Sequence, residues 1–350
     1  MALSPLEKIM SSKQSPSKIT VGILVPSYPP PLLNPSAKPI GKAVSNLDSN
    51  KLQIVFGNIL EEERGSIFMS GLSIINNSWT PKKIAIDALH DRFPSQIRFK
   101  QFQSILLYTK ELFFGNPFAI TMLCRDKIAT QRYLEKHGVQ MPEIIIEHQA
   151  FSDQLAKWKT GFIKPQFGAL GKNVRTITAN SPLPEFLEGV VPERKERTFI
   201  QRAITPPKGW KGLSLRQLVQ RNPDGSWLVL PAVLRRSRED MVVNIARGAE
   251  AVLAEDHLPA STMENIYNQS IKISKTLQNF PNGENSVEFG LDFVIDQNYH
   301  AWLIEVNSRP RGRLEILAKK MPERFESIHQ RACLAPILYL AKQAENRLTD

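Results

Sequence analysis

Long apolar runs are absent from this 350-residue sequence, and no segment approaches the roughly 18 consecutive apolar residues that a membrane helix requires. Cysteine is almost absent too. The two that occur, Cys124 and Cys333, make neither a ligand cluster nor a disulfide framework. Residues 1–18, MALSPLEKIMSSKQSPSK, lack the apolar core of a secretory signal and are typical of a flexible polar tail. These absences predict a cytoplasmic protein with no membrane partner.

The signatures of several enzyme classes are missing as well. No Ser-His-Asp or Cys-His arrangement indicates a covalent enzyme intermediate, and the six histidines are scattered without the spacing of metal ligands. Neither the Walker A loop, G-x-x-x-x-G-K-[ST], nor the dinucleotide fingerprint, G-x-G-x-x-G, occurs. Any chemistry must therefore come from another arrangement of charged and polar side chains.

Positive charge is present in excess, with a formal net charge of +11 and an isoelectric point near 9.6. Such an excess favours polyanionic partners such as nucleotides, nucleic acids and acidic peptides. The basic residues are spread along the chain, however, with no run of five and no interleaved aromatic motif of the RNA-binding kind. A solvated basic surface is the simpler interpretation, and nucleic acid is not the favoured partner.

The order of apolar segments predicts an α/β or α+β fold with several hairpins. We expect strands at 19–26, 51–59, 82–89, 141–148, 161–166, 197–204, 286–296 and 300–308, and a hairpin over 215–236 around the turn sequence NPDGS. We expect helices within 91–115 and at 126–139, 151–159, 262–280 and 322–346.

Three oxygen donors stand out in the last predicted hairpin. Glu305 and Asn307 are two residues apart, so both side chains leave the same face of their strand. If the two strands pair antiparallel, Asp292 lies on the partner strand near the same level. One or two carboxylates together with substrate phosphates is the usual way to hold Mg²⁺. Arg309 and Arg311 follow directly and would neutralise an anion there.

A second candidate is the stretch FIKPQFGALGKNVRTI. Lys164 lies inside an apolar strand and is followed by Gly168 and Gly171, which suggests a cation and a pliable backbone loop over phosphates. A glycine pair after a strand is more often a plain turn, and that alternative stays open.

Further polar residues, Arg216, Arg235 and Asn244, recur near the ends of predicted strands. Such a set is compatible with phosphate or carboxylate binding. In the first domain, Asp91 and Arg92 follow an apolar strand and suit either an acceptor pocket or an ion pair that closes a loop.

Taken in this order, the motifs resemble those of the ATP-grasp superfamily. The sequence is most similar to the YheC/YheD group of endospore-coat-associated ATP-grasp proteins and more distantly similar to RimK-type glutamate ligases. The segments that carry the resemblance are VGILVPSY, DALHDRFPS, VVNIARGAEA, EFGLDFVID and WLIEVNSRP, and the likeness extends over residues 20–340. It implies an ATP-grasp fold with an N-terminal α/β pre-ATP-grasp domain.

The resemblance also implies a domain division and a set of ligand contacts. The domains would be a tail at 1–18, the pre-ATP-grasp domain at 19–115, a central lid subdomain at 116–205 and a C-terminal subdomain at 206–350. Mg²⁺ would be ligated by Asp292, Glu305 and Asn307. The α- and β-phosphates of ATP would be contacted by Lys127 and Lys164, and the triphosphate would be covered by a loop containing Gly168, Gly171 and Lys172.

The remaining implied contacts concern adenine and the reacting groups. The hinge against adenine would consist of Gln201, Arg202, Ala203 and Ile204. The γ-phosphate or an acyl phosphate would face Arg216 and Arg235, with Asn244 beside them, and Arg309 would hold the acceptor carboxylate or the phosphate. Two positions depart from related ligases, which often have an acidic residue at Arg202 and commonly have Asp at Ser214.

The implied activity is that of an ATP-dependent carboxylate–amine ligase with small-molecule or peptide substrates. ATP and Mg²⁺ would be its cofactors, and a homo-oligomer is compatible with the resemblance. Three alternatives stay open: a non-catalytic nucleotide-binding coat protein, a kinase-like phosphoryl transfer that stops before the amine, and a nucleic-acid-binding protein.

Overall fold

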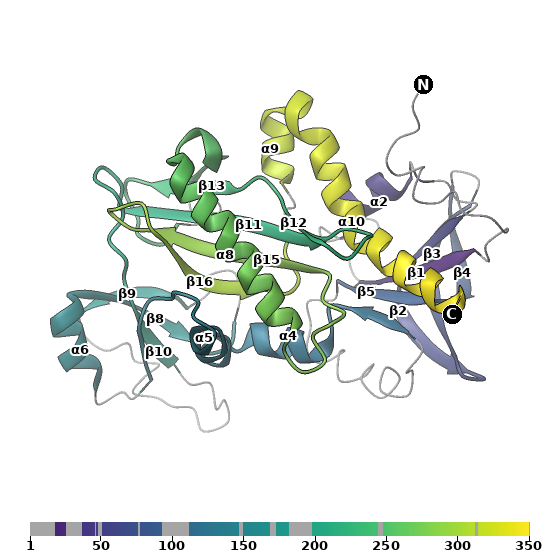
Figure 1. The fold of residues 1–350 in the computed structure, drawn as a ribbon, viewed down its shortest axis with the longest axis horizontal. Helices are drawn as coiled ribbons and strands as arrows, with labels where there is room; N and C mark the ends of the chain where they lie inside the picture. Colours follow the sequence, from purple (N-terminus) through teal and green to yellow (C-terminus); the bar gives the residue numbers. More distant parts are fainter. Residues whose placement is uncertain are drawn as a thin grey trace. The chain divides into compact units, whose positions relative to one another are not determined.

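The computed structural model describes residues 18–25, 37–45, 47, 51–75, 78–92, 112–146, 150–168, 173–181, 198–243, 248–311 and 314–349. The chain divides by its internal contacts into two units, one formed by 1–113 with 341–350 and the other by 114–340 (Figure 1). No helix among the described residues is long and apolar enough to cross a membrane. Residues 1–17 of the predicted tail, and most of the helix predicted within 91–115, lie outside the described ranges.

The first unit is built on a sheet with the strand order β4-β3-β2-β1-β5. Its elements are β1 (Ile19–Leu24), α2 (Lys38–Val44), β2 (Leu52–Glu63), β3 (Ser66–Ile75), β4 (Ser78–Ala85), β5 (Ala88–Asp91) and the end of α10 (Pro322–Thr349). Strand β1 pairs in parallel with both β2 and β5, and all six of its residues are buried, as is typical of a central parallel strand. A short strand, β6 (Phe113–Gly115), spans the boundary between the units.

The prediction of one strand over 82–89 is wrong, because the chain changes partners in the middle of it. The amide of Ile86 donates to the carbonyl of Ile67 in β3, whereas the amide of Asp87 donates to the carbonyl of Thr20 in β1. The Asp87 carboxylate also accepts from the Thr20 amide at 2.7 Å. Residues 82–85 therefore complete an antiparallel hairpin with β3, and β5 begins a new parallel partner of β1.

The second unit contains two sheets. The smaller has the order β7-β10-β8-β9 and the larger has the order β14-β13-β11-β15-β16, with β12 paired to β11. Their strands are β7 (Ile144–Ile145), β8 (Thr160–Pro165), β9 (Arg175–Thr178), β10 (Thr198–Arg202), β11 (Gly212–Arg221), β12 (Trp227–Val229), β13 (Val233–Ser237), β14 (Glu250–Leu253), β15 (Glu288–Ile295) and β16 (Ala301–Asn307). The helices are α4 (Phe118–Arg125), α5 (Lys127–Lys136), α6 (Phe151–Trp158), η4 (Ala254–Asp256), α8 (Ala260–Gln278), α9 (Glu315–Lys320) and the first part of α10.

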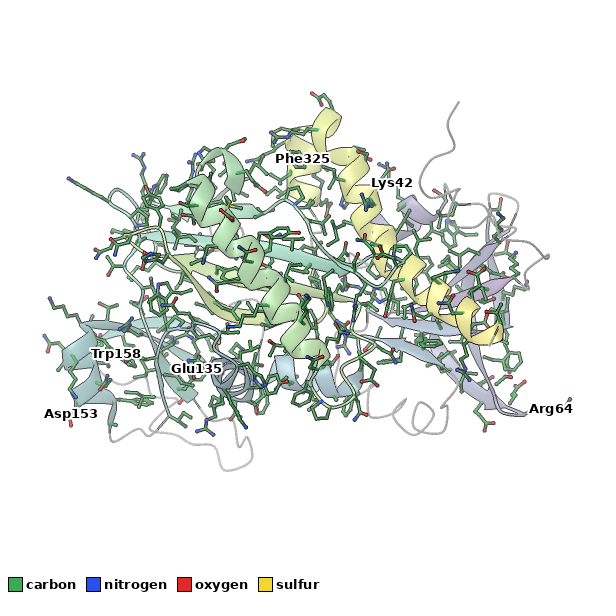
Figure 2. All side chains as sticks on the ribbon, in the orientation of Figure 1. Lys42, Arg64, Glu135, Asp153, Trp158 and Phe325 are labelled. Carbon is green, nitrogen blue, oxygen red and sulfur yellow. The ribbon has the colours of Figure 1, made fainter. Side chains whose placement is uncertain are left out.

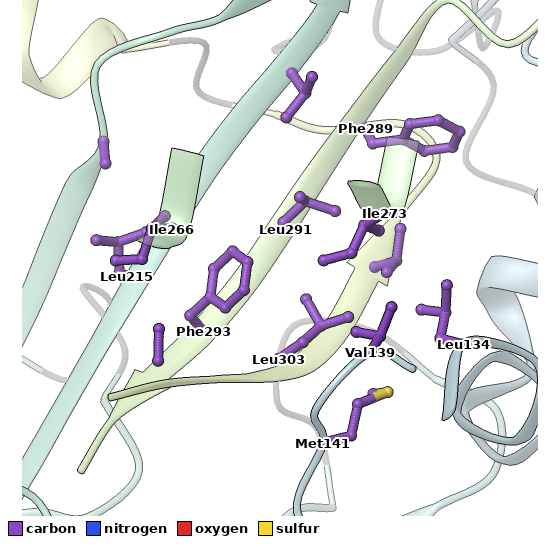
Figure 3. Packing of buried hydrophobic residues seen from close by; sticks show 14 of the residues in the cluster. Leu134, Val139, Met141, Leu215, Ile266, Ile273, Phe289, Leu291, Phe293 and Leu303 are labelled. Carbon is purple, nitrogen blue, oxygen red and sulfur yellow. The ribbon is translucent and has the colours of Figure 1, made fainter. Parts of the chain in front are cut away.

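The main core lies between the larger sheet and α8 (Figure 3). Ile266 and Ile273 of α8 are fully buried with Leu215 of β11, Phe293 of β15 and Leu303 of β16. The apolar spacing of α8 places these residues on one side of the helix, which lies across the sheet in Figure 1. One face of the sheet thereby packs against α8. The opposite face carries polar side chains and, beside them, a second apolar cluster formed with α9 and α10.

Most sequence predictions for the second unit are confirmed. The hairpin around NPDGS forms between β11 and β12, the last two strands pair antiparallel, and α5, α6, α8 and α10 occupy their expected ranges. The helix α5 begins where the Asp126 carboxylate accepts from the Ala129 amide at 2.9 Å and ends before Gly138, whose φ is +70°. The strand predicted at 141–148 is much shorter, since only Ile144 and Ile145 pair, with β10.

Candidate functional site

The polar face of the larger sheet carries the first half of the candidate site. Residues that lie directly opposite each other in an antiparallel pair share one face, and β11 pairs Arg216 with Asp292 of β15. The adjacent positions, Leu215 and Phe293, are fully buried in the core with α8. The strand alternation therefore places Arg216 and Asp292 on the face turned away from α8.

Asp292 is the centre of this half. One of its carboxylate oxygens accepts from Nε of Arg216 and from Nη2 of Arg235, each at 2.7 Å. The other accepts from Nη2 of Arg216 at 2.7 Å and from Nδ2 of Asn307 at 3.0 Å. The pairing with Arg216 is bidentate, the strongest geometry between these two groups. Three of the predicted site residues thus meet at Asp292.

A β-bulge brings Glu305 to the same place. The register pairs Asp292 with Glu305 but Phe293 with Leu303, so Ile304 is an extra residue in β16. Leu303 is fully buried in the core, and a regular strand would have turned Glu305, two residues later, to that same apolar face. The bulge instead sets Glu305 opposite Asp292.

The pKa values of the two carboxyl groups, Asp292 and Glu305, are shifted in opposite directions. Burial opposes ionisation of Asp292, but the guanidinium groups of Arg216 and Arg235 outweigh it and hold the pKa of Asp292 below its ordinary value. Burial and the nearby charge of Asp292 raise the pKa of Glu305, against the attraction of Lys127, Arg216 and Lys164. No donor among the described residues hydrogen-bonds the Glu305 carboxylate. Within the described ranges, Glu305 thus differs from Asp292, whose two oxygens both accept from side-chain donors.

Glycine at position 290 makes room for Arg216. A Cβ atom on Gly290 would lie 2.8 Å from Cβ of Pro310 and 3.1 Å from Nη1 of Arg216. Gly290 is two residues before Asp292 on the same strand, so it shares the polar face. The absence of a side chain there leaves space for the Arg216 guanidinium group that binds Asp292.

The smaller sheet carries the second half of the site. Ile163 of β8 and Ile200 of β10 pack against Phe151 of α6 in a separate apolar cluster. Lys164 and Gln201 follow these residues directly, so their side chains lie on the opposite face of the sheet. There Nζ of Lys164 donates to Oε1 of Gln201 at 2.6 Å.

Helix α5 contributes Lys127 at its first position. The Lys127 ammonium donates to the carbonyl of Gly168 at 2.8 Å, at the start of the predicted glycine loop. Gly168 has a φ of +142°, a conformation that favours glycine. The N-cap residue Asp126 accepts from Nε2 of Gln166 at 2.8 Å, which ties the same loop to the helix. Lys127 and the loop are thereby held together.

Electrostatics link the two halves into one site. Burial lowers the pKa of Lys164 to about 8, Glu305 opposes that shift and Lys127 adds to it. Burial likewise lowers the pKa of Lys127, again opposed by Glu305. The basic side chains outnumber the carboxylates by four to two, and the six residues are Lys127, Lys164, Arg216, Arg235, Asp292 and Glu305. Such an excess of positive charge suits a polyanionic ligand.

The four predicted hinge residues have different environments. Gln201 and Arg202 end β10, and the amides of Arg202 and Ala203 donate to the carbonyls of Glu143 and Thr160. The Arg202 guanidinium lies 5.5 Å from the ring of Trp302 and 3.5 Å from the Glu143 carboxylate. The half-buried residue Ile204 follows outside the strand.

Three oxygen-bearing side chains of the site, Asp292, Glu305 and Asn307, are the candidates for holding Mg²⁺. No group of three His, Cys, Asp or Glu side chains with the arrangement of a metal site occurs in the described part of the chain. Asp292 and Glu305 nevertheless face each other in register, and Asn307 bonds Asp292 as the third oxygen-bearing side chain. A cation beside Glu305 would counteract the burial and the Asp292 charge that raise the pKa of Glu305, since opposite charge favours a carboxylate. The donor set thus fits a hard cation.

For the other predicted residues, the structure gives either no description or only their position and burial. Gly171, Lys172 and Asn244 lie outside the described ranges, and their roles stay predictions. Arg309 is half-buried two residues after Asn307. In the first unit, Asp91 and Arg92 are buried at the end of β5.

Sequence reasoning missed two polar residues of α5, Asp126 and Gln131. The N-cap position of Asp126 could have been recognised, because Asp directly before a helical pattern is a start signal. Gln131 gives no local signal, since its partners, Gln201 and the Pro142 carbonyl, come together only in the fold.

The chain is similar to known proteins both in sequence and in fold. Residues 175–339 match the family model described as YheC/D like ATP-grasp. D-alanyl-alanine synthetase A from Vibrio cholerae O1 biovar eltor str. N16961 superposes with a TM-score of 0.60 and 12% identity, covering 91% of this chain and 99% of that one. The chain has the ATP-grasp fold. The predicted resemblance and fold class are both confirmed.

Two further relatives define how far the likeness extends. D-alanine-D-alanine ligase from Coxiella burnetii shares the ATP-grasp fold with a TM-score of 0.58 and 14% identity, over 95% of this chain and 97% of that one. Endospore coat-associated protein YheC of Bacillus subtilis (strain 168) is 21% identical over 237 residues, or 58% of this chain. The chain spans 64% of that relative's length.

Proposed function

We propose that the protein is an ATP-dependent carboxylate–amine ligase that forms an amide bond through an acyl phosphate. The observation that carries the proposal is the excess of cations around the two facing carboxylates, because buried basic side chains of this kind bind phosphate groups. The likeness in fold to ligases supports the same reaction class.

The proposed reaction has two steps. A substrate carboxylate oxygen attacks the γ-phosphorus of ATP, the bond from that phosphorus to the bridging oxygen breaks, and ADP leaves. The amine then attacks the acyl carbon and loses a proton, and the bond from that carbon to the phosphate oxygen breaks to release phosphate. Little covalent chemistry is left for side chains, so the protein acts mainly through position and charge.

The charged residues divide this work. Lys127 and Lys164 would bind the α- and β-phosphates, and Arg216 with Arg235 would stabilise negative charge on the transferred phosphoryl group. Mg²⁺, held by the facing carboxylates Asp292 and Glu305 with Asn307, would neutralise phosphate charge. The arginines already bind Asp292, so phosphate would compete with that carboxylate for their donors.

The remaining assignments are part of the same proposal. Adenine would lie against the Gln201–Ile204 hinge, the loop from Gly168 to Lys172 would cover the triphosphate, and Asn244 and Arg309 would contact the reacting groups. The substrates would be a small-molecule or peptide carboxylate and an amine, in the cytoplasm. We leave open a homo-oligomer and place no nucleic acid or membrane among the partners.

A second candidate is a non-catalytic protein that binds nucleotide without turning it over. One observation favours it: both oxygens of Asp292 already accept from protein donors, which leaves Glu305 as the open carboxylate. The likeness to a coat-associated protein points in the same direction. Binding of ATP with no release of ADP would support this candidate.

The deciding experiment measures ADP release with Mg²⁺ and ATP in the presence of pools of amino acids and short peptides. A ligase should release ADP only with a matching carboxylate and amine. With an ¹⁸O-labelled carboxylate, one labelled oxygen should appear in the released phosphate, because the acyl phosphate is formed on that oxygen. Release without any need for an amine would instead indicate a kinase-like transfer.

A pair of variants separates the site from the fold. Glu305→Gln should abolish Mg²⁺-dependent turnover, whereas Glu264→Gln, an exposed residue of α8 on the other side of the sheet, should leave it unchanged. Turnover that persists in Glu305→Gln would contradict the metal assignment. Absence of both ADP release and ATP binding in the wild type would contradict both candidate functions.

A further inference from the structure

A chain of buried side-chain hydrogen bonds connects helix α5 to Lys164. Nε2 of Gln131 donates to the carbonyl of Pro142 at 2.7 Å, and Oε1 of Gln131 accepts from Nε2 of Gln201 at 3.2 Å. Oε1 of Gln201 accepts in turn from Nζ of Lys164 at 2.6 Å. Both glutamines are only 2% exposed, so water does not substitute for these partners.

The order of donors and acceptors in these hydrogen bonds is fixed at Gln131. The two hydrogens on Nε2 of Gln131 serve two acceptors, the Pro142 carbonyl and the Glu135 carboxylate at 2.8 Å. Neither acceptor can donate, so rotating the Gln131 amide by 180° would face oxygen against oxygen. Oε1 of Gln131 must therefore point to Gln201. Glu135 is marked on α5 in Figure 2.

The orientation of the Gln131 amide also fixes the orientation of the Gln201 amide. Gln201 can donate to Gln131 only through its nitrogen, which leaves its oxygen for Lys164. A reversed Gln201 amide would place an N–H group against the ammonium and repel it. The carbonyl is also neutral, so it holds the ammonium in place without cancelling its charge, as a carboxylate would.

The position of Gln131 on α5 also relates it to Lys127. Lys127 and Gln131 are four residues apart on α5, so they lie on one face, one turn from each other. One helix therefore presents a cation to the glycine loop and, a turn later, holds the second cation of the site through Gln201.

We infer that Gln131 is a positioning residue, whose amide sets the orientation of Gln201 and thereby aims the charged ammonium of Lys164 at a phosphate of the nucleotide. The inference rests on the proposed function, because it takes Lys164 to be a phosphate ligand. It assigns the Gln201 side chain to Lys164, leaving the backbone of the hinge for adenine.

The test is a double-mutant cycle on MgATP affinity, measured by calorimetry with the full-length chain. Gln131→Met removes the donor and acceptor at nearly constant volume and should weaken MgATP binding by about three- to tenfold, the equivalent of one hydrogen bond. In the Lys164→Met background, the same change should have no further effect, because the group it positions is gone.

The control is the neighbouring residue Thr130. Its hydroxyl is buried and donates to the Leu123 carbonyl at 2.6 Å, so Thr130→Val removes a structural hydrogen bond from the same helix. That variant should lose stability but keep wild-type MgATP affinity. If Gln131→Met does not fold, Gln131→Asn, which is too short to reach both Pro142 and Gln201, replaces it in the cycle.

The outcomes separate the inference from the proposed function. Weaker MgATP binding in Gln131→Met that vanishes in the Lys164→Met background would support the positioning role. Unchanged binding, or the same loss with and without Lys164, would overturn it while leaving the ATP site intact. A wild-type protein that binds no MgATP would overturn the proposed function, and the inference with it.

Discussion

Removing the charge of Asp292 should destabilise the protein more than any other single change in the site. The carboxylate is 7% exposed and accepts from Arg216 and Arg235, whose side chains are 27% and 18% exposed. The variant Asp292→Asn keeps the size of the side chain but leaves both guanidinium groups facing a neutral amide.

The expected loss follows from these contacts. Breaking a buried ion pair by removing one partner costs about 3–5 kcal/mol. Both arginines retain some contact with water, so we expect the lower end, about 3 kcal/mol. For a unit the size of 114–340, that corresponds to a fall in melting temperature of about 6–12 °C.

Glu305→Gln provides the matched comparison, because it removes a carboxylate one strand away. Burial and Asp292 raise the pKa of Glu305, so in the folded state its charge is unfavourable at neutral pH. The stability contribution of this group falls as pH rises through its ordinary value toward the raised one. Its neutral replacement should leave stability unchanged or raise it slightly, by up to about 1 kcal/mol.

The assay is urea unfolding without nucleotide at pH 7, followed by tryptophan fluorescence. Four of the five tryptophans, Trp158, Trp210, Trp227 and Trp302, lie in the unit 114–340, so the signal reports mainly that unit. The reasoning would be refuted if Asp292→Asn were as stable as the wild type, or if Glu305→Gln lost as much stability as Asp292→Asn.

Three further predictions concern other parts of the site. Gly290→Val should destabilise by about 1–3 kcal/mol in the same urea assay and more than Gly290→Ala, because the added atoms displace the Arg216 guanidinium. Lys164→Met should be more stable than the wild type at pH 7 by about 1–3 kcal/mol. Its advantage should shrink between pH 8 and 10.5, where native Lys164 has lost its proton and the unfolded chain keeps it; an advantage that does not change over that range would contradict the lowered pKa. Burial and Glu305 raise the pKa of Cys124 to about 12, and Cys333 is buried as well, so Ellman's reagent should detect no thiol before unfolding and two in urea.

Local chemistry made much of the second unit predictable. Apolar segments and the NPDGS turn predicted β11, β12, β15 and β16 of the larger sheet but not β14, and the apolar residues of 262–280 predicted α8. The thirteen-residue spacing of Asp292 and Glu305 predicted that they would meet across the last hairpin, as they do in the register. The helix expected at 126–139 is α5, which ends before Gly138.

Other features depend on contacts that no local pattern encodes. The strand expected over 82–89 breaks because Ile86 and Asp87 find different partners, Ile67 and Thr20, far away in the sequence. The direction of the Gln131 amide likewise depends on the Pro142 carbonyl beyond the end of α5, together with Glu135 one turn along the helix.

The sequence by itself determined which residue types carry the chemistry: two carboxylates and an amide in one hairpin, a lysine inside a strand, and arginines near strand ends. Only the tertiary structure decided how they face one another. The bulge at Ile304 turns Glu305 from the core face to Asp292, and Arg216 binds Asp292 over a glycine. The physical reason is that side-chain direction along a strand follows from register, which is set by pairing with distant segments and by packing against α8.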